Sequence, residues 1–212
     1  SITLQTPNAA VGSSSSSWSY PADAGSVTNT TVEACGGATC TTSQRSLNIA
    51  TAGVFQYMTF GDWSDVGGSS GTVPAVGGFF VAGQETAPGN IPTSGTATYV
   101  GATGGLYLNG GAVSDFVSQF RADANFASRQ LAVSTSGMQV NGVLTPQFDY
   151  AGTLSYAPGS NQFNGALLTV TPGAGMGTAT GKFFGPTAQE IGGVTDMSYG
   201  SARAIGVFVG KR

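Results

Sequence analysis

GKFFGPTAQEIGG, residues 181–193, is followed by the last predicted strand, SARAIGVFVGKR, which ends at Arg212. An earlier segment, PTSGTATYVG (residues 92–101), begins a strand directly after a stretch rich in proline and glycine. The earlier segment opens a run of short strands and the later one closes it. We therefore expect a β-barrel whose first and last strands pair, because closure removes exposed sheet edges.

Between these segments the sequence alternates between apolar and polar residues. Phe116, Phe120 and Phe126 share one parity, whereas Arg121 and Asp123 have the other. A period of two predicts strands with one buried face. The expected fold class is all-β, with an eight-stranded antiparallel barrel filled by its own large side chains. The predicted strands are Ala97–Val100, Phe116–Phe126, Arg129–Thr135, Gln147–Tyr156, Asn161–Val170, Met176–Phe184, Asp196–Tyr199 and Ala202–Val209.

Four segments of this region are expected to interrupt the strands. Short helical turns are predicted at Val113–Arg121 and Pro186–Ile191. GATGG (residues 101–105) and GAGMG (residues 173–177) look like phosphate-binding loops, but neither opens a helix and neither carries a lysine. Both are therefore predicted to be turns.

The N-terminal part of the chain has a weaker pattern. Residues 1–27 are rich in serine and predict an irregular segment. Strands are expected at Val54–Phe60 and Gly77–Gly83, with a turn in GDWSDVGG after the first. Prolines 88 and 92 indicate a connector, because proline donates no ladder hydrogen bond. We expect a small β domain at residues 1–91 and the barrel at residues 92–212.

Charged residues make up only 8% of the chain, and the formal net charge is −3. Globular domains usually contain roughly 25% charged residues. No basic stripe is present to bind phosphates, so nucleic-acid partners are not expected. No long apolar run or polybasic segment predicts a membrane span or an anionic-lipid contact. A surface of hydroxyls and amides is common in exported bacterial β proteins. No signal peptide is visible, so for an exported protein either the signal lies outside this sequence or the mature chain begins near Ser1.

Cys35 and Cys40 are the only cysteines, and four residues separate them. A redox or metal pair is one interpretation, although the chain contains no histidine and no second cysteine pair. A small structural disulfide is the interpretation that we favour. It would indicate an oxidising compartment.

Three segments resemble the β-barrel domain of transferrin-binding protein B-like proteins of Gram-negative bacteria. They are residues 78–105 (GFFVAGQETAPGNIPTSGTATYVGATGG), residues 120–134 (FRADANFASRQLAVS), and GKFFGPTAQEIGGV with the terminal VFVGKR. The resemblance implies a β handle domain at residues 1–91 followed by an eight-stranded barrel. It also implies export, to the outer-membrane surface or by secretion, and a role in binding rather than catalysis. Family members with a lipid anchor begin the mature chain with cysteine, whereas this sequence begins with Ser1.

The residue types in GKFFGPTAQEIGG explain how this segment can form a turn. Gly185 and Pro186 turn the chain after Phe184, and Gly192 and Gly193 allow conformations closed to other residues. Glu190 is expected to accept hydrogen bonds from backbone N–H groups within that turn.

Residue types exclude several chemistries. The absence of histidine removes the Ser–His–Asp and Cys–His arrangements and histidine-ligated haem. Asp62 and Asp65 in GDWSD are spaced as a carboxylate pair, but a calcium loop would need more oxygen ligands, and a polar turn is the favoured interpretation. Haem ligation by tyrosine or methionine stays open by residue type alone. The candidates are Tyr20, Tyr57, Met58, Tyr107 and Met176.

We therefore expect an exported, monomeric, non-catalytic protein without a cofactor. Its loops would capture an unidentified ligand: a host protein, an iron source, haem or a solute. The alternative is a structural or adhesive surface protein without a small ligand. Loops on such a scaffold carry specificity.

The cysteine pair generates the first testable prediction. Thiol titration of the denatured, unreduced protein should detect no free thiol, because Cys35 and Cys40 are expected to be bonded to each other. The same titration after reduction serves as the control. Two free thiols before reduction would contradict the disulfide.

Overall fold

The computed structural model describes residues 55–67 and 76–212, with side chains for residues 55–62 and 78–212, and gives five strands before residue 51. The chain forms two compact units. Unit 1 consists of Ser1–Ala52 and Gly61–Gly78, and unit 2 consists of Gly53–Phe60 and Phe79–Arg212.

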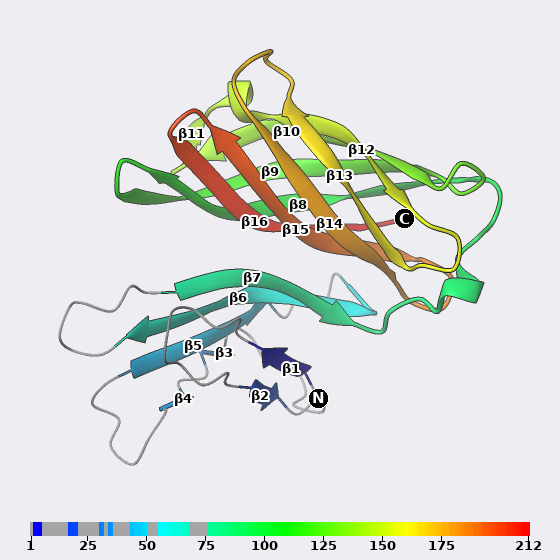
Figure 1. The fold of residues 1–212 in the computed structure, drawn as a ribbon, viewed down its shortest axis with the longest axis horizontal. Coiled ribbons are helices and arrows are strands. Elements are labelled where there is room, and N and C mark those ends of the chain that lie inside the picture. Colours follow the sequence, from blue (N-terminus) through cyan, green and yellow to red (C-terminus); the bar gives the residue numbers. More distant parts are fainter. Residues whose placement is uncertain are drawn as a thin grey trace. The chain divides into compact units, whose positions relative to one another are not determined.

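The described strands form three sheets (Figure 1). A two-stranded sheet contains β1 (Ile2–Gln5) and β2 (Ser17–Tyr20). A five-stranded sheet contains β3 (Thr30–Thr31), β4 (Ala34–Cys35), β5 (Ser43–Ala50), β6 (Met58–Gly67) and β7 (Val76–Gly83). The third sheet contains β8 (Thr96–Asn109), β9 (Ala112–Asn125), β10 (Gln130–Val140), β11 (Val143–Leu144), β12 (Tyr150–Tyr156), β13 (Gln162–Thr169), β14 (Met176–Phe184), β15 (Glu190–Tyr199) and β16 (Ala202–Lys211).

Eight strands of the third sheet close into an antiparallel barrel. Each strand pairs with the next around the ring, except that β10 passes over the short β11 to pair with β12. The ring closes where β16 pairs with β8 over nine residue pairs, from Arg203↔Leu108 to Lys211↔Val100. The predicted all-β class, the eight-stranded barrel and the pairing of its first and last strands are confirmed.

Strand β9 shows why the alternating sequence forms this wall. Phe116, Phe120 and Phe126 are buried, whereas Arg121 and Asp123 are exposed. The helical turn predicted at Val113–Arg121 is wrong. Cross-strand pairing with β8 on one side and β10 on the other satisfies the backbone of this segment as a strand.

The predicted turn in GATGG is also wrong, because these residues lie inside β8. A Cβ atom on Gly101 or Gly105 would lie 2.0 or 2.1 Å from a carbonyl oxygen of β16. Glycine is therefore used here for the close approach of two strands rather than for a turn. By contrast, residues 173–175 of GAGMG lie in the connection between β13 and β14, as predicted, whereas Met176 and Gly177 begin β14.

Side chains fill the barrel. Tyr99, Tyr150, Phe163, Phe183 and Phe208 belong to its core and are each at most 1% exposed. The rings of Phe163 and Phe183 meet edge to face with centroids 5.1 Å apart, and Phe208 stacks on Phe120. The interior is a packed hydrophobic core, as the large inward residues predicted.

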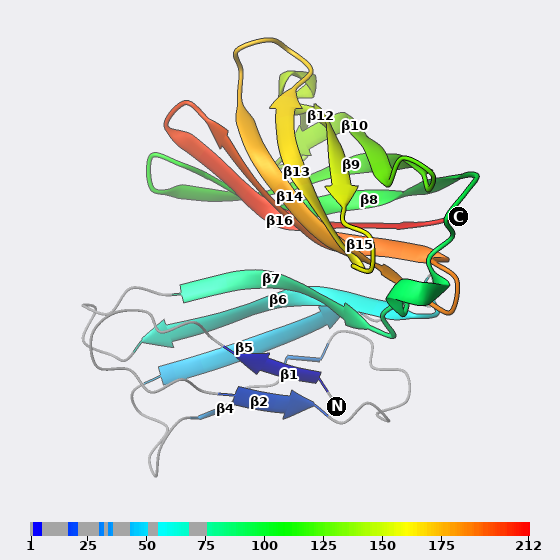
Figure 2. The same ribbon diagram turned by 45° about the vertical axis from the view of Figure 1, so that its right-hand side comes forward.

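Antiparallel order places the connections of the barrel at two opposite ends, as Figures 1 and 2 show. We call one the anchor end; it holds the connections at residues 126–129, 157–161 and 185–189 and the C-terminus. We call the other the rim end; it holds the connections at residues 110–111, 141–149, 170–175 and 200–201.

Two further predicted turns are corrected, and two 3₁₀ turns are added. Strand β6 begins at Met58 and continues to Gly67, so GDWSD lies in a strand, not in a turn. The segment Pro186–Ile191 forms a turn and the start of β15, without a helix. Two 3₁₀ turns that the sequence analysis missed are η1 (Pro88–Asn90) and η2 (Pro146–Phe148), and each begins with proline, whose fixed φ suits a first helical position.

Buried tyrosines predict how stability depends on alkaline pH. Burial raises the pKa of Tyr150 to about 12, and burial also raises the pKa of Tyr99 and Tyr199. An unfolded chain ionises its phenols near a pKa of about 10. Between these values the folded state binds more protons than the unfolded state, so stability must fall as pH rises.

We therefore expect the free energy of unfolding to decrease above about pH 10, by up to about 1.4 kcal/mol per pH unit for each such phenol. Urea denaturation at about pH 9 and about pH 11 measures the change. The absorbance of tyrosinate in the native protein is the internal control. Equal stability at both pH values would contradict the burial of these hydroxyls.

Candidate binding site

The carboxylate of Glu190 anchors a distant segment to the barrel. Glu190 is the first residue of β15 and is only 4% exposed. Its Oε1 accepts a hydrogen bond from the backbone N–H of Gln56 at 2.6 Å, and its Oε2 accepts one from the N–H of Tyr57 at 3.0 Å. Glu190 therefore accepts backbone N–H groups, as expected, but they come from 133 and 134 residues away and not from its own turn.

A small apolar cluster lies on the same outer face of the barrel. Met58, Phe184 and Val209 are buried together, with partly buried neighbours from residues 55–60 and from Val81. Gly192 makes the approach of this segment feasible, because a Cβ atom there would lie 2.8 Å from Val81 and 2.9 Å from the sulfur of Met58.

The neighbouring Gly193 serves the interior instead. A Cβ atom on Gly193 or on its cross-strand partner Gly181 would lie 2.6 or 2.7 Å from the ring of Phe208. The two glycines of the EIGG motif thus face opposite sides of β15. Gly192 leaves room for the segment that Glu190 holds, and Gly193 leaves room for the ring of Phe208.

The turn before Glu190 is fixed from several directions. The hydroxyl of Tyr99 donates to the carbonyl of Ala188 at 2.6 Å, and Arg212 donates to the carbonyl of Thr187 at 2.7 Å. The hydroxyl of Thr86 donates to the carbonyl of Gly185 at 2.6 Å. The turn at residues 185–190 is therefore a structural anchor, since the carbonyls of Gly185, Thr187 and Ala188 accept hydrogen bonds from within the protein.

The rim end differs in its exposed side chains. Ten large hydrophobic residues are exposed among the side chains that the structure describes, and seven of them lie on hairpins that end here. We call these seven the apolar rim: Leu108 and Val113 of β8–β9, Val143 and Leu144 of β11, and Leu168, Val170 and Met176 around the β13–β14 connection.

Asp149 holds the rim connections together. Its side chain is buried, with only 7% exposed. Its carboxylate accepts the N–H groups of Gly137 at 2.9 Å and Met138 at 3.1 Å, where the register of β10 shifts against β9. The hydroxyl of Ser118 donates to it at 3.2 Å. This buried carboxylate supplies acceptors to a bulge that leaves the ladder.

Backbone hydrogen bonds join the three apolar hairpins into one structure. The N–H of Asn141, in the turn before β11, donates to the carbonyl of Asp115 in β9 at 2.8 Å. The N–H of Val170 donates to the carbonyl of Asp149 at 2.8 Å. These hydrogen bonds therefore link neighbouring connections at the rim end.

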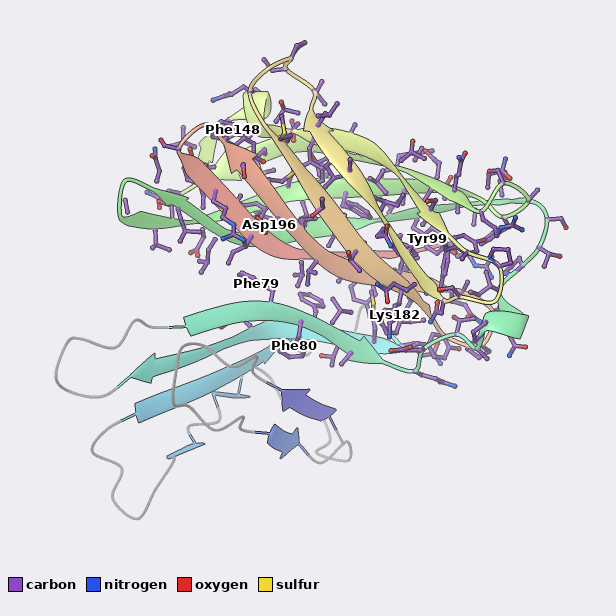
Figure 3. All side chains as sticks on the ribbon, in the orientation of Figure 1. Phe79, Phe80, Tyr99, Phe148, Lys182 and Asp196 are labelled. Atoms are coloured by element: carbon purple, nitrogen blue, oxygen red, sulfur yellow. The ribbon has the colours of Figure 1, made fainter. Side chains whose placement is uncertain are left out.

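Aromatic rings lie beneath these connections. Phe148 stacks against Tyr107 with ring centroids 5.4 Å apart and lies 4.6 Å from Tyr199. Figure 3 places Phe148 at the opposite side of the barrel from Tyr99 and Lys182, which belong to the anchor end. On the wall nearby, Arg203 donates to Asp196 at 2.8 Å and holds the pKa of that carboxyl below its ordinary value.

The residues singled out from the sequence fall in several places. Cys35 lies in β4 without a described side chain, and Cys40 lies outside the described residues, so their disulfide stays a prediction. Asp62 and Asp65 both lie in β6, and the side chain of Asp65 is outside those described.

The haem-ligand candidates are dispersed. Tyr57 and Met58 lie at the Glu190 anchor, Tyr107 and Met176 lie toward the rim end, and the side chain of Tyr20 is outside those described. Within the described residues, no three histidine, cysteine or acidic side chains gather as a metal site. None of the helices described has the length and apolar character that crossing a bilayer requires.

Comparison with known families identifies the barrel. Residues 91–212 match the family described as the C-lobe and N-lobe beta barrels of Tf-binding protein B. The chain belongs to this family. It is a family of non-catalytic binding proteins, which agrees with the expectation from the sequence. No curated protein sequence matches the chain.

Solved structures show the same fold at low sequence identity. Intact Ap-TbpB, with its N and C lobes, is 19% identical with a TM-score of 0.62, and the match covers 89% of this chain and 39% of that one. A transferrin-binding protein B variant from Haemophilus parasuis Hp5 is 21% identical (TM-score 0.58; 84% and 38% covered). The isotype 1 protein from serogroup B Neisseria meningitidis is 19% identical (TM-score 0.55; 87% and 35% covered). The chain thus spans less than two fifths of the length of these relatives.

The anchor generates a mutational prediction. Glu190→Gln keeps the size of the side chain but places an NH₂ group against one of two backbone donors. We expect a loss of about 1–3 kcal/mol in the free energy of unfolding and faster amide exchange at Gln56 and Tyr57.

Glu85→Gln is the matched control. Glu85 pairs with Lys182 at 2.6 Å, but both side chains are at least 40% exposed. Its substitution should cost at most about 1 kcal/mol. An equal effect of the two substitutions, or unchanged exchange at Gln56 and Tyr57, would contradict the anchor.

Proposed function

We propose that this chain is an exported binding protein that captures a protein ligand through its connecting loops. It would act as a monomer at the outer-membrane surface or after secretion from a Gram-negative bacterium. We retain the proposal that residues 1–91 form a handle domain and residues 92–212 the barrel. Membership of a family described by transferrin binding supports the binding role.

The filled barrel is the observation that carries the choice of ligand class. Tyr99, Phe163, Phe183 and Phe208 are fully buried in the space where a calyx would hold a solute. A ligand must therefore bind outside the wall, where loops offer a surface rather than an enclosing cavity. Surface binding of this kind suits a macromolecule, because a small molecule needs most of its area buried to be held.

The described side chains are poorly suited to binding haem. Met58 is 7% exposed inside an apolar cluster, and the rim end offers no unpaired lysine or arginine among its described side chains to bind propionates. Charge-assisted pairs are the usual way to hold a carboxylate. We expect haem affinity to be weak.

The test compares the two ligand classes directly. Transferrin is the first protein to measure, because the relatives are named for binding it. We expect saturable binding of a purified host iron-carrying protein, transferrin or lactoferrin, at about micromolar affinity or tighter by biolayer interferometry. Haem titration followed by visible absorbance should show no stoichiometric complex. Stoichiometric, sub-micromolar haem binding without any protein binding would overturn the proposal.

A further inference from the structure

Glycine follows asparagine at three places in the barrel: Asn109-Gly110, Asn141-Gly142 and Asn164-Gly165. An asparagine in this position can lose its side-chain amide without an enzyme. Glycine favours the reaction because it has no side chain to crowd its own nitrogen and because its backbone rotates with little restriction. The three dipeptides are identical in sequence, but the structure places them in different surroundings.

The reaction has two steps and consumes one water molecule. The backbone nitrogen of the glycine loses its proton and attacks Cγ of the asparagine, the new N–Cγ bond closes a five-membered imide, and the side-chain nitrogen leaves as ammonia. Water then adds to one of the two imide carbonyls and opens the ring. Opening on one side gives aspartate, and opening on the other gives isoaspartate, in which the main chain runs through the side-chain carbon.

Ring closure requires a particular backbone angle. The asparagine must reach a ψ near about −120°, the value found at the first central residue of a type II′ turn. Antiparallel strands have a ψ near about +135°. Asn164 lies inside β13, where it pairs with Ser155 of β12 and Thr180 of β14. Rotating its peptide would break the ladder of a strand that is paired on both sides, so the reaction must wait for local unfolding.

Asn141 is placed very differently. It is exposed and forms the two-residue turn between β10 and β11 with Gly142. Their φ angles of 49° and 74° fit a type I′ turn. Rotation of the single peptide between them converts a type I′ turn into a type II′ turn and gives Asn141 the required ψ. The pair Val140↔Val143 and the hydrogen bond from the N–H of Asn141 to Asp115 lie outside that peptide.

Asn109 also lies at the tip of a hairpin. It is the exposed last residue of β8, and the turn to β9 consists of Gly110 and Gly111, with φ angles of 57° and 86°. Rotating the peptide between Asn109 and Gly110 disturbs only Asn109↔Ala112, the terminal pair of the hairpin. Gly110 accepts either sign of φ, so the rotation meets little steric resistance.

We propose that Asn109 and Asn141 are sites of spontaneous deamidation in the folded protein, whereas β13 protects Asn164. Conversion of both residues adds two negative charges to a chain whose formal net charge is −3. Both charges appear at the rim end, on connections of the barrel. This inference does not depend on the proposed function, because the reaction needs only the chain and water.

The experiment follows the full chain during incubation in a mildly alkaline buffer. Peptide mapping by mass spectrometry measures the conversion at each asparagine, and isoaspartyl methyltransferase detects isoaspartate. We expect Asn109 and Asn141 to react at least about tenfold faster than Asn164, since only Asn164 requires the opening of a central strand. The same incubation in guanidinium chloride is the control, and there the three asparagines should react at similar rates.

A double variant, Asn109→Asp and Asn141→Asp, serves as the charge standard. Incubated wild-type protein should approach the mobility of this variant in native electrophoresis, and the variant itself should keep its mobility over the same time. Conversion of Asn164 as fast as the hairpin tips, or unchanged mobility of the wild type, would overturn the inference. So would slow conversion of Asn164 in guanidinium chloride, because protection would then come from the sequence, and so would aspartate without isoaspartate, because no imide would have formed.

Discussion

The pairing of β16 with β8 closes the barrel and fixes which residues of both strands face its core. It joins the last ten strand residues of the chain to a strand that begins at Thr96, over nine residue pairs. Without it, both strands would expose an unpaired edge. Closure also fixes the faces of β15 and β16: Phe208 points into the core, while Val209 and Gly192 point outward to receive the segment at Met58.

Two buried carboxylates, at opposite ends of the barrel, accept hydrogen bonds from backbone N–H groups that the strand ladder leaves unpaired. Glu190 accepts two backbone N–H groups of the segment before β6, and Asp149 accepts two of the β10 bulge. A buried carboxylate needs hydrogen-bond donors, and a buried backbone N–H group needs an acceptor, because an unpaired buried polar group destabilises the fold. One carboxylate therefore attaches a segment at the anchor end, and the other shapes the surface at the rim end.

Much of the barrel could be predicted from the sequence, because strand alternation and large inward residues have a direct signature. Phe116 and Phe120 show it in β9, and Phe126 continues it directly after the strand. The errors arose where one residue type serves two purposes. Glycines in GATGG looked like a turn but permit close strands. The donors to Glu190 were out of reach for sequence reasoning, because backbone N–H groups more than 130 residues away leave no pattern.

The filled core separates stability from binding. Phe163, Phe183 and Phe208 hold the barrel from inside, so residues at the hairpin tips can change without altering these contacts. This accounts for a fold that is kept at about one fifth sequence identity to its structural relatives. Val143 and Leu144 are more than 60% exposed, so their side chains contribute little to the core.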